Sequence, residues 1–426
     1  MSYIKRAAES RVLKASKSFK VVLVTGPRQV GKTTMLKHLA ETERENEEPK
    51  RNYVTLDDIE VRDLARRDPS MFLDAYPAPV LIDEVQYAPE ILPYIKMRVD
   101  DCEGNGTYWL TGSQPFHLMQ NVSESLAGRV CILEMLGLSN SEYANVEQRA
   151  FIPSKELFSE RLQEMPSLNS AEVFERIARG SYPHISSLDE ETRRDAYGSL
   201  IATYIMRDVH FLRKVGDESS FYAFLRACAA MNGRPINVAE LARIADVDAK
   251  TAKSWLSILE SSYVIKLLPM YSNNLLKRLT KAPVLHFVDT GLCAHLTGFH
   301  TSEQVANGAM AGHLVETFAH NEIYKSMLNT GESVRNLYFF RNKSQEEIDI
   351  LLENGDVVYP IEVKKSTKAN IHDLKAVRAL KPLENATKDK DTLPFSRKVG
   401  VKTLLNLGDK SLPINEDEFS FPIWAI

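Results

Sequence analysis

Nine consecutive residues near the start of the chain combine types that hold phosphate: Gly26, Pro27, Arg28, Gln29, Val30, Gly31, Lys32, Thr33 and Thr34. Two glycines enclose four residues and are followed by Lys and Thr, which is the spacing of a P-loop. The glycines let backbone N–H groups face an anion, Lys32 reaches the β- and γ-phosphates, and the Thr33 hydroxyl ligates Mg²⁺. The pattern therefore predicts a site for a nucleoside triphosphate and Mg²⁺.

A second group of residues suits hydrolysis of that nucleotide. The apolar run 80–82 ends in Asp83 and Glu84, so one carboxylate binds Mg²⁺ through water and the other polarises the attacking water. Another apolar run, 108–112, leads into Ser113 and Gln114, and either side chain would orient the same water. The alternatives are that the two acids only begin a solvated loop and that Gly-Ser-Gln is an ordinary turn.

A third group of acids lies in the last third of the chain. Asp349 falls in one alternating run, Glu362 and Lys364 in the next, and Glu316 near the start of a helical segment. Residues two apart on a strand share a face, so Glu362 and Lys364 point together. Three such carboxylates would hold Mg²⁺, with Lys364 stabilising the attacking hydroxide or the phosphorane. Three interpretations stay open: an active nuclease, a binding domain that does not cleave, and a salt-bridged surface.

Alternating strands and helices must position the first two groups. Apolar runs at 21–25, 53–57, 80–84 and 108–112 are separated by helix-like segments, one of which, 34–40, directly follows the P-loop. Such alternation is typical of a mainly parallel sheet covered by helices.

Residues 221–270 predict a helix-turn-helix with a β-wing. Helix-like segments at 221–231, 238–245 and 249–261 precede a strand-like run at 263–268, with Asp248 as N-cap of the third helix. In a DNA-binding protein that helix presents these polar residues to the groove or the phosphates: Lys250, Thr251, Lys253 and Ser254. Packing against a protein partner is the alternative. A basic cluster follows, which meets either phosphate or solvent: Lys277, Arg278 and Lys281.

The order of these motifs resembles a known family, the AAA+-type ATPases that carry a C-terminal domain of unknown function 4143 (DUF4143). The resemblance covers nearly the whole chain, and Ser181 stands where the family usually has Gly. It rests on the P-loop and on six further segments in order: 81–90, 109–114, 125–129, 180–183, 204–209 and 289–292.

The resemblance implies an ATP hydrolase that uses Mg²⁺. It nominates Arg129 and Arg207 as arginines that neutralise charge on the γ-phosphoryl group, in the same chain or from a neighbour in a homo-oligomer. A surface salt bridge or a packing role is the alternative for each. In the C-terminal region, Asp349 and the run 362–364 resemble the PD-(D/E)xK nuclease core, with Ile348 in place of its proline.

We therefore expect an α/β fold in four parts: a P-loop, AAA+-like ATPase core with a parallel sheet (1–138), a helical lid (139–220), a winged helix-turn-helix (221–300), and a C-terminal restriction-endonuclease-like α/β domain (301–426). The expected function is Mg²⁺-dependent ATP hydrolysis coupled to binding or remodelling of nucleic acid, with branched DNA suggested by analogy to junction resolvases. One alternative is a nucleotide-gated protein-binding switch in signalling, stress response or defence. The other is a metal-dependent nuclease licensed by ATP.

Bulk composition limits the class without choosing the partner. The 426 residues are 44% hydrophobic and 26% charged, with a net charge of −4, so DNA binding needs a local basic patch. Four widely spaced cysteines without a CxxC pair argue against structural zinc and a disulfide framework. No run approaches the roughly 20 apolar residues of a membrane span, and the first residues lack a signal-peptide core. We expect a cytoplasmic protein with no membrane partner.

Overall fold

The computed structural model describes residues 3–45, 50–113, 122, 124–205, 218–272, 278, 281–341, 346–378, 380–382, 393–395 and 397–426. The chain divides into two compact units. The first is Met1–Leu138 with Ser261–Tyr263 and Asn329–Gly331, and the second is Ser139–Glu260, Val264–Leu328 and Glu332–Ile426.

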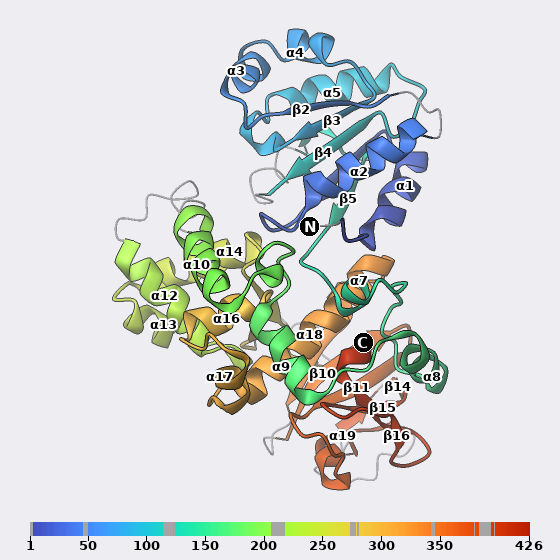
Figure 1. Cartoon of the computed structure of the whole chain (residues 1–426), viewed down its shortest axis with the longest axis vertical. Coiled ribbons are helices and arrows are strands. Elements are labelled where there is room, and N and C mark those ends of the chain that lie inside the picture. The colour runs from blue at the N-terminus through green and yellow to red at the C-terminus, as the bar shows by residue number, and fades with distance from the viewer. Residues whose placement is uncertain are drawn as a thin grey trace. The chain divides into compact units, whose positions relative to one another are not determined.

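The first unit is a five-stranded parallel sheet with helices on both faces (Figure 1). The strand order is β2-β3-β4-β1-β5, and all neighbouring pairs are parallel. The strands are β1 Val21–Thr25, β2 Asn52–Thr55, β3 Val80–Asp83, β4 Tyr108–Gly112 and β5 Val130–Glu134. The helices are α1 Ala8–Ser18, α2 Lys32–Glu45, α3 Ile59–Arg67, α4 Pro69–Ala75, the 3-10 turn η1 Val85–Tyr87 and α5 Ile91–Asp100. The parallel α/β sheet expected from the sequence is thus confirmed.

Strand β1 is apolar throughout because both of its faces are covered. Val21 and Leu23 pack in a buried cluster with side chains of α3, α4 and α5. Val22 and Val24 point the other way, into a cluster with α1 and α2. A strand buried on both faces has no polar alternation, which is why it appears in the sequence as one continuous apolar run.

The strand order determines which loops meet at the site. Strand β4 lies between β1 and β3, and parallel strands end at the same edge of a sheet. The segments that follow β1, β4 and β3 are therefore neighbours at the carboxyl edge. These segments are the P-loop, Ser113 and Glu84.

The described residues of the second unit form a group of helices, two small sheets and a larger mixed sheet. The helical elements are α7 Asn140–Ala144, α8 Lys155–Glu164, α9 Ser170–Arg179, η2 Ile185–Ser187, α10 Glu190–Leu200, the π-helical turn η3 Ile201–Ile205, α12 Glu218–Ala230, α13 Val238–Ile244, α14 Ala249–Ser261, α16 Thr290–Leu296, α17 Ser302–Asn307, α18 Ala311–Thr330, η4 Val334–Asn336, η5 Ile371–Leu374, α19 Lys375–Arg378 and η7 Ile423–Ala425. Within the described residues none of the helices is both long and apolar enough to cross a membrane.

The described residues of this unit form three sheets, one of which is the parallel pair of β12 and β13. In the small antiparallel sheet, β8 lies between β6 and β7. In the larger sheet, β9, β10 and β11 are antiparallel neighbours, whereas β11, β15 and β17 run parallel. The strands are β6 Arg234–Pro235, β7 Ile265–Leu268, β8 Val284–Phe287, β9 Leu337–Arg341, β10 Glu347–Asn354, β11 Val357–Val363, β12 Leu380–Pro382, β13 Leu393–Phe395, β14 Lys398–Val399, β15 Lys402–Asn406, β16 Leu412–Pro413 and β17 Glu418–Pro422.

The helices of residues 139–205 contact two parts of the second unit. Helix α8 lies against the larger sheet, where Phe158 stacks on Phe421 with ring centroids 4.3 Å apart. The buried Arg161 donates to the backbone oxygens of Ala425 at 3.1 Å and Ile426 at 3.3 Å. Helix α9 instead packs with α16 and α17, and α10 packs with α16. The described part of the expected lid, 139–220, thus contacts both the larger sheet and the helices α16 and α17, and the lid itself stays a prediction.

Candidate functional site

The P-loop lies between the end of β1 at Thr25 and the start of α2 at Lys32, as the sequence predicts. Gly26 adopts φ +147°, and a Cβ at this position would lie 1.9 Å from the backbone oxygen of Met135, so only glycine fits. The Lys32 side chain is 5% exposed. Its Nζ donates to the backbone oxygens of Gly26 at 3.0 Å and Pro27 at 2.7 Å. The ammonium group therefore lies within the loop that is built to receive phosphate.

Arg6 supports this loop, and sequence reasoning missed it. The guanidinium donates from Nη1 to the Val30 oxygen at 2.6 Å and from Nη2 to the Leu136 oxygen at 2.8 Å. The side chain is 5% exposed, and its backbone N–H donates to Glu9 Oε1 at 2.7 Å. Arg6 thus ties the P-loop to the segment that follows β5. No local pattern marks an isolated arginine for such a role.

Asp83 is the centre of a small oxygen cluster at the end of β3. Its Oδ1 accepts from Thr33 Oγ1 at 2.6 Å and from Thr111 Oγ1 at 2.5 Å. Its Oδ2 accepts from the Tyr53 hydroxyl at 3.4 Å. The structure therefore brings Thr33 and Asp83 together as predicted. A hydroxyl and a carboxylate are hard oxygen donors of the kind that Mg²⁺ prefers.

Glu84 follows in a left-handed backbone conformation, with φ +57°. Its backbone N–H donates to Thr111 Oγ1 at 2.9 Å. Its Oε2 accepts from Ser113 Oγ at 2.9 Å and from Gln86 Nε2. Ser113 therefore reaches the carboxylate that we expect to polarise water, and its role there stays a prediction. Gln114, the other candidate, lies outside the described residues.

A third carboxylate lies close to this pair. Burial, followed by the negative charges of Glu84 and Asp83, raises the pKa of Asp57 above its ordinary value. The positive charges of Arg28 and Arg62 oppose this rise. The carboxyl edge of the sheet is thus acidic even before a nucleotide adds its own negative charge, which favours a bound cation.

Of the two nominated arginines, the structure describes only Arg129. Arg129 precedes β5, and its backbone oxygen accepts from Val21 N at the start of β1. It therefore lies at the edge of the sheet opposite the P-loop, where its side chain pairs with Asp100. An action of Arg129 on its own nucleotide is excluded by this position, whereas an action on a neighbouring chain stays a prediction. Arg207 lies outside the described residues.

The predicted acidic centre forms where β10 and β11 pair. Ile350 lies opposite Ile361, which places Asp349 beside the 362–364 run. Asp349 Oδ2 accepts from the Val363 backbone N–H at 2.8 Å, and Lys364 Nζ lies 2.5 Å from Glu362 Oε1.

Burial dominates the electrostatics of this centre. It raises the pKa of Glu362 to about 7, although Lys364 opposes the rise. Burial and the charges of Glu362 and Glu316 raise the pKa of Asp349 well above its ordinary value. Burial lowers the pKa of Lys364, but attraction to Glu362 and Asp349 outweighs it, so this pKa is raised. Glu362 Oε2 is buried and has no hydrogen-bond partner. The centre thus holds more buried carboxyl groups than Lys364 alone can neutralise, so they bind protons more tightly than exposed acids do.

Glu316 does not join the other two acids as directly as predicted. It lies on α18, and its Oε2 is 3.0 Å from His313 Nδ1. Within the described ranges, no three His, Cys, Asp or Glu side chains form a group that could hold a metal ion. Glu316 therefore acts on Asp349 and Glu362 through its charge, whereas a metal-ligand role stays a prediction.

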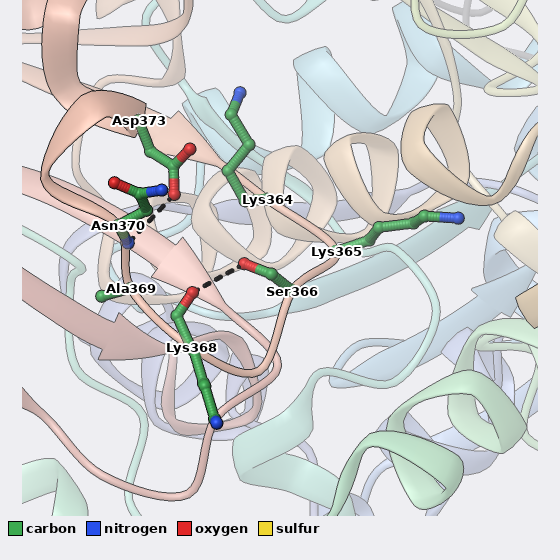
Figure 2. Close-up of a pocket in the computed structure, with 7 residues that line it drawn as sticks. All are labelled: Lys364, Lys365, Ser366, Lys368, Ala369, Asn370 and Asp373. Atoms are coloured by element: carbon green, nitrogen blue, oxygen red, sulfur yellow. Dashed lines mark hydrogen bonds between the residues drawn. The ribbon is translucent and has the colours of Figure 1, made fainter.

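A pocket of about 550 Å³ opens beyond the end of β11. It is lined by Lys364, Lys365, Ser366, Lys368, Ala369, Asn370 and Asp373. Figure 2 shows that the three lysine side chains point in different directions. Asp373 is occupied in accepting from the Asn370 backbone N–H at 3.1 Å. The pocket therefore lacks the convergent donors that would hold a single phosphate group.

The predicted DNA-facing helix is α14. Asp248 accepts from the Thr251 backbone N–H at 2.9 Å, as expected of an N-cap, and Lys250 and Lys253 are exposed. The basic cluster beyond it differs from the expectation. Arg278 Nη1 donates to the Tyr338 hydroxyl at 2.9 Å and forms an ion pair with the buried Glu353 of β10. Arg278 is therefore a packing residue, Lys281 is exposed, and Lys277 lies outside the described residues.

Three protein-family models match the chain. An "AAA domain" matches residues 18–144, "Domain of unknown function (DUF8612)" matches 170–303, and "Domain of unknown function (DUF4143)" matches 311–426. The chain combines an AAA-type ATPase domain with a DUF4143 region. ATP is accordingly the nucleotide of the P-loop, and the AAA-type ATPase domain includes every residue of the site around Asp83 and Glu84.

Two curated proteins are similar over most of the chain. Uncharacterized protein Mb2031c of Mycobacterium bovis and Uncharacterized protein Rv2008c of Mycobacterium tuberculosis are each 27% identical over 374 residues. The match covers 86% of this chain and 75% of each relative. Neither name states an activity.

Solved structures resemble the chain only weakly. The replication initiator DnaA bound to AMPPCP and single-stranded DNA is 16% identical, with a TM-score of 0.26 over 61% of this chain and 89% of that one. AMPPCP-bound DnaA from Aquifex aeolicus is 15% identical, with a TM-score of 0.23 over 61% of this chain and 89% of that one. A Signal Transduction ATPase with Numerous Domains (STAND) protein with a tetratricopeptide repeat sensor, from Pyrococcus horikoshii, is 12% identical. Its TM-score is 0.19 over 78% of this chain and 48% of that one. The assignment of the AAA-type ATPase domain rests on the family model.

Two motifs of the resemblance meet inside the DUF8612 match and have a structural role there. The buried Asp289 caps α16 by accepting from the Leu292 N–H at 2.7 Å. It also accepts from the Tyr197 hydroxyl at 2.7 Å and the Ser181 N–H at 2.6 Å. A Cβ at Gly180 would lie 2.2 Å from the Tyr197 hydroxyl. Hydrogen bonds to Asp289 therefore hold the 180–183 and 289–292 segments together, and we call this contact the clasp.

Proposed function

We propose that the chain is a Mg²⁺-dependent ATPase that couples ATP binding and hydrolysis to nucleic acid. The observation that carries the ATPase is the arrangement around Thr111. This hydroxyl donates to Asp83 and accepts from the Glu84 N–H, so it fixes the metal-side acid and the water-side acid relative to each other. Pre-organised charge of this kind is a large part of enzymatic rate enhancement.

Thr33 and Asp83 are the residues that would hold Mg²⁺, and their hydroxyl and carboxylate oxygens fit that ion. Bound there with ATP, Mg²⁺ neutralises negative charge on the phosphates. Lys32 would exchange the backbone oxygens of Gly26 and Pro27 for phosphate oxygens as its acceptors. Glu84 then accepts the proton of the attacking water.

The middle of the chain supports the nucleic-acid part of the proposal. In sequence, α12, β6, α13, α14, β7 and β8 follow the order of a winged helix-turn-helix, with β8 between β6 and β7. The exposed Lys250 and Lys253 of α14 are a local positive patch on a chain of net charge −4. Neutralisation of DNA phosphates by such lysines is strongly salt-dependent.

ATP turnover tests the first part. Lys32→Ala and Glu84→Gln should each abolish turnover, whereas Lys14→Ala, which removes an equal charge from the exposed surface of α1, should leave it unchanged. Turnover should rise when DNA is added. A rate indifferent to single-stranded, duplex and branched DNA would exclude the coupling and favour the nucleotide-gated protein-binding switch.

A charge-matched comparison locates the DNA contact. The double variant of Lys250→Ala and Lys253→Ala should bind duplex DNA more weakly and depend less steeply on salt. The matched control removes Lys410, which is exposed, together with Lys14. Equal DNA affinities of the two double variants would remove α14 from the proposal.

A mixing experiment tests the homo-oligomer. Arg129→Ala chains keep their own phosphate site, and Glu84→Gln chains keep Arg129. If Arg129 acts on a neighbour's nucleotide, mixing two variants that are inactive alone should restore part of the turnover. Absence of any recovery, with both variants folded and assembled, would contradict an action in trans.

A second candidate function is metal-dependent nucleic-acid cleavage at Asp349 and Glu362. The buried, unpartnered Oε2 of Glu362 favours it, because a buried carboxylate oxygen without a donor suits a cation. Mg²⁺- or Mn²⁺-dependent cleavage should disappear in Asp349→Ala and in Glu362→Ala. It should persist in Asp356→Ala, which removes an exposed acid from the β10–β11 turn. Cleavage that survives the first two variants would come from elsewhere.

A further inference from the structure

Gln86 forms a closed triangle of hydrogen bonds with the two residues that we expect to act on the attacking water. It lies in η1, the turn directly after Glu84. Its Nε2 donates to Glu84 Oε2 and, at 3.1 Å, to Ser113 Oγ. Ser113 Oγ in turn donates to the same Glu84 oxygen at 2.9 Å. Two side chains from neighbouring strand ends, Gln86 and Ser113, therefore donate to the same carboxylate oxygen of Glu84.

The donors and acceptors of this triangle can be assigned in one way only. An ionised carboxylate accepts and never donates, so both neighbours must offer it a proton. Ser113 has a single hydroxyl proton, which it gives to Glu84, and it therefore accepts from Gln86. The reversed amide would place the Gln86 oxygen against the Glu84 oxygen. The Nε2 of Gln86 must face the carboxylate.

The triangle leaves the other carboxylate oxygen of Glu84 available. Both side-chain donors go to Oε2, and the part of the chain that the structure describes supplies no donor to Oε1. The backbone of Glu84 is fixed separately, through its N–H on Thr111 Oγ1 and its left-handed conformation. The result is a carboxylate held at the backbone and at one oxygen, with the second oxygen left to accept a proton.

The amide of Gln86 is only half used. Its Oε1 is buried without a hydrogen-bond partner, and a buried acceptor without a donor costs stability. An apolar side chain of the same shape would avoid that cost. The side chain is therefore better explained by what Nε2 does for Glu84 than by the stability of the domain.

We propose that Gln86 is a positioning residue for ATP hydrolysis. With Ser113 it fixes Glu84 Oε2, so that Oε1 faces the attacking water and takes its proton as the water oxygen bonds to the γ-phosphorus and the bond to the ADP oxygen breaks. The proposal rests on the proposed ATPase function, and it adds a residue to which neither the P-loop nor the acidic pair points.

Gln86→Met tests this role because methionine keeps the length of the side chain and removes the amide. We expect kcat for ATP to fall about 10- to 100-fold, as for partial loss of a positioned base. KM for ATP and the affinity for a fluorescent ATP analogue should change less than about twofold, because Gln86 contacts neither Lys32 nor Thr33. The melting temperature should be unchanged or higher, since the unpaired oxygen is gone.

A second variant shows whether Gln86 acts through Glu84. Ser113→Ala removes the other donor to the same oxygen, so the combined loss in kcat should be smaller than the product of the two single losses. A double variant whose loss in kcat equals the product of the two single losses would show that the two side chains do not act through the same carboxylate. This result would overturn the proposal.

The outcomes distinguish a failure of the Gln86 proposal from a failure of the proposed ATPase function on which it rests. Turnover that persists in Lys32→Ala and Glu84→Gln would refute the ATPase function itself. If those variants are inactive and Gln86→Met keeps the full kcat, only the role of Gln86 is refuted. A variant with lower kcat, higher KM and a lower melting temperature together would show that Gln86 is structural, which also overturns the proposal.

Discussion

Acid should destabilise the second unit through two stacked histidines. His320 on α18 and His286 on β8 have ring centroids 4.4 Å apart and an interplanar angle of 10°. His286 Nδ1 lies 2.8 Å from Thr317 Oγ1, and His320 is 2% exposed. Burial lowers the pKa of His320 to about 4 and that of His286 well below its ordinary value. Neither imidazole can easily take up a proton while the unit is folded.

The magnitude follows from the difference between the two states. An unfolded histidine has a pKa of about 6.5, so above that pH His320 is neutral in both states and contributes no pH dependence. As the pH falls from 6.5 toward 4, only the unfolded chain gains the proton, and stability is lost. His320 alone should cost about 2 kcal/mol between pH 8 and pH 5, and about 3 kcal/mol below pH 4. His286 adds to this loss.

Urea unfolding of the full chain at pH 8 and pH 5 measures the effect, with hydrogen exchange of β8 and α18 to locate it. His320→Gln cannot become charged, so it should lose about 2 kcal/mol less than the unchanged protein on going to pH 5. His372→Gln, at an exposed position of η5, is the matched control and should behave like the unchanged protein. If His320→Gln shows the same loss on acidification, the buried histidine pair is not the acid-sensitive element.

Three further predictions follow from single contacts. Gly26→Ala would place a Cβ 1.9 Å from the Met135 oxygen; about 1–3 kcal/mol of strain in the phosphate-binding loop should weaken fluorescent ATP-analogue binding about 10- to 100-fold. Asp289→Ala removes the acceptor of the Tyr197 hydroxyl and of the Ser181 and Leu292 N–H groups. Urea unfolding should therefore show a free energy of unfolding lower by about 3 kcal/mol. An unchanged urea midpoint would contradict the role of these hydrogen bonds. Because burial raises the pKa of Glu362 from 4.5 to about 7, metal-free protein should lose up to about 3 kcal/mol as the pH rises through that range, and Glu362→Gln should remove this dependence in urea titrations.

Local chemistry was predictable from the sequence because it depends on consecutive residues. The strand, glycine loop and helix around Lys32 lie within some twenty residues, so spacing alone indicates how they are arranged. The acidic pair after β3 is marked in the same way by an apolar run that ends in charge. The comparisons confirm the AAA-type ATPase domain that these patterns indicated.

What the sequence could not supply was the order of strands. Thr111 reaches Asp83 and Glu84 because β4 lies beside β3 in the sheet. No feature of residues 108–112 in the sequence predicts that β3 is their neighbour. The family resemblance that nominates Arg129 likewise leaves open which chain's nucleotide it would serve, because only the fold shows that β5 begins at the edge of the sheet opposite the P-loop. Arg6 and Gln86 were missed because each acts through contacts that depend on the folded loop rather than on spacing.

The packing of α8 joins the C-terminal region to a segment far away in the sequence. The segment 139–164 is joined to the segment 311–426 through Phe158, Phe421 and Arg161. A fragment cut at the limits of the DUF4143 match would expose the apolar surface that α8 covers and remove the guanidinium that binds the Ala425 and Ile426 oxygens. Supplied as a separate peptide, 139–164 should bind such a fragment and complement it.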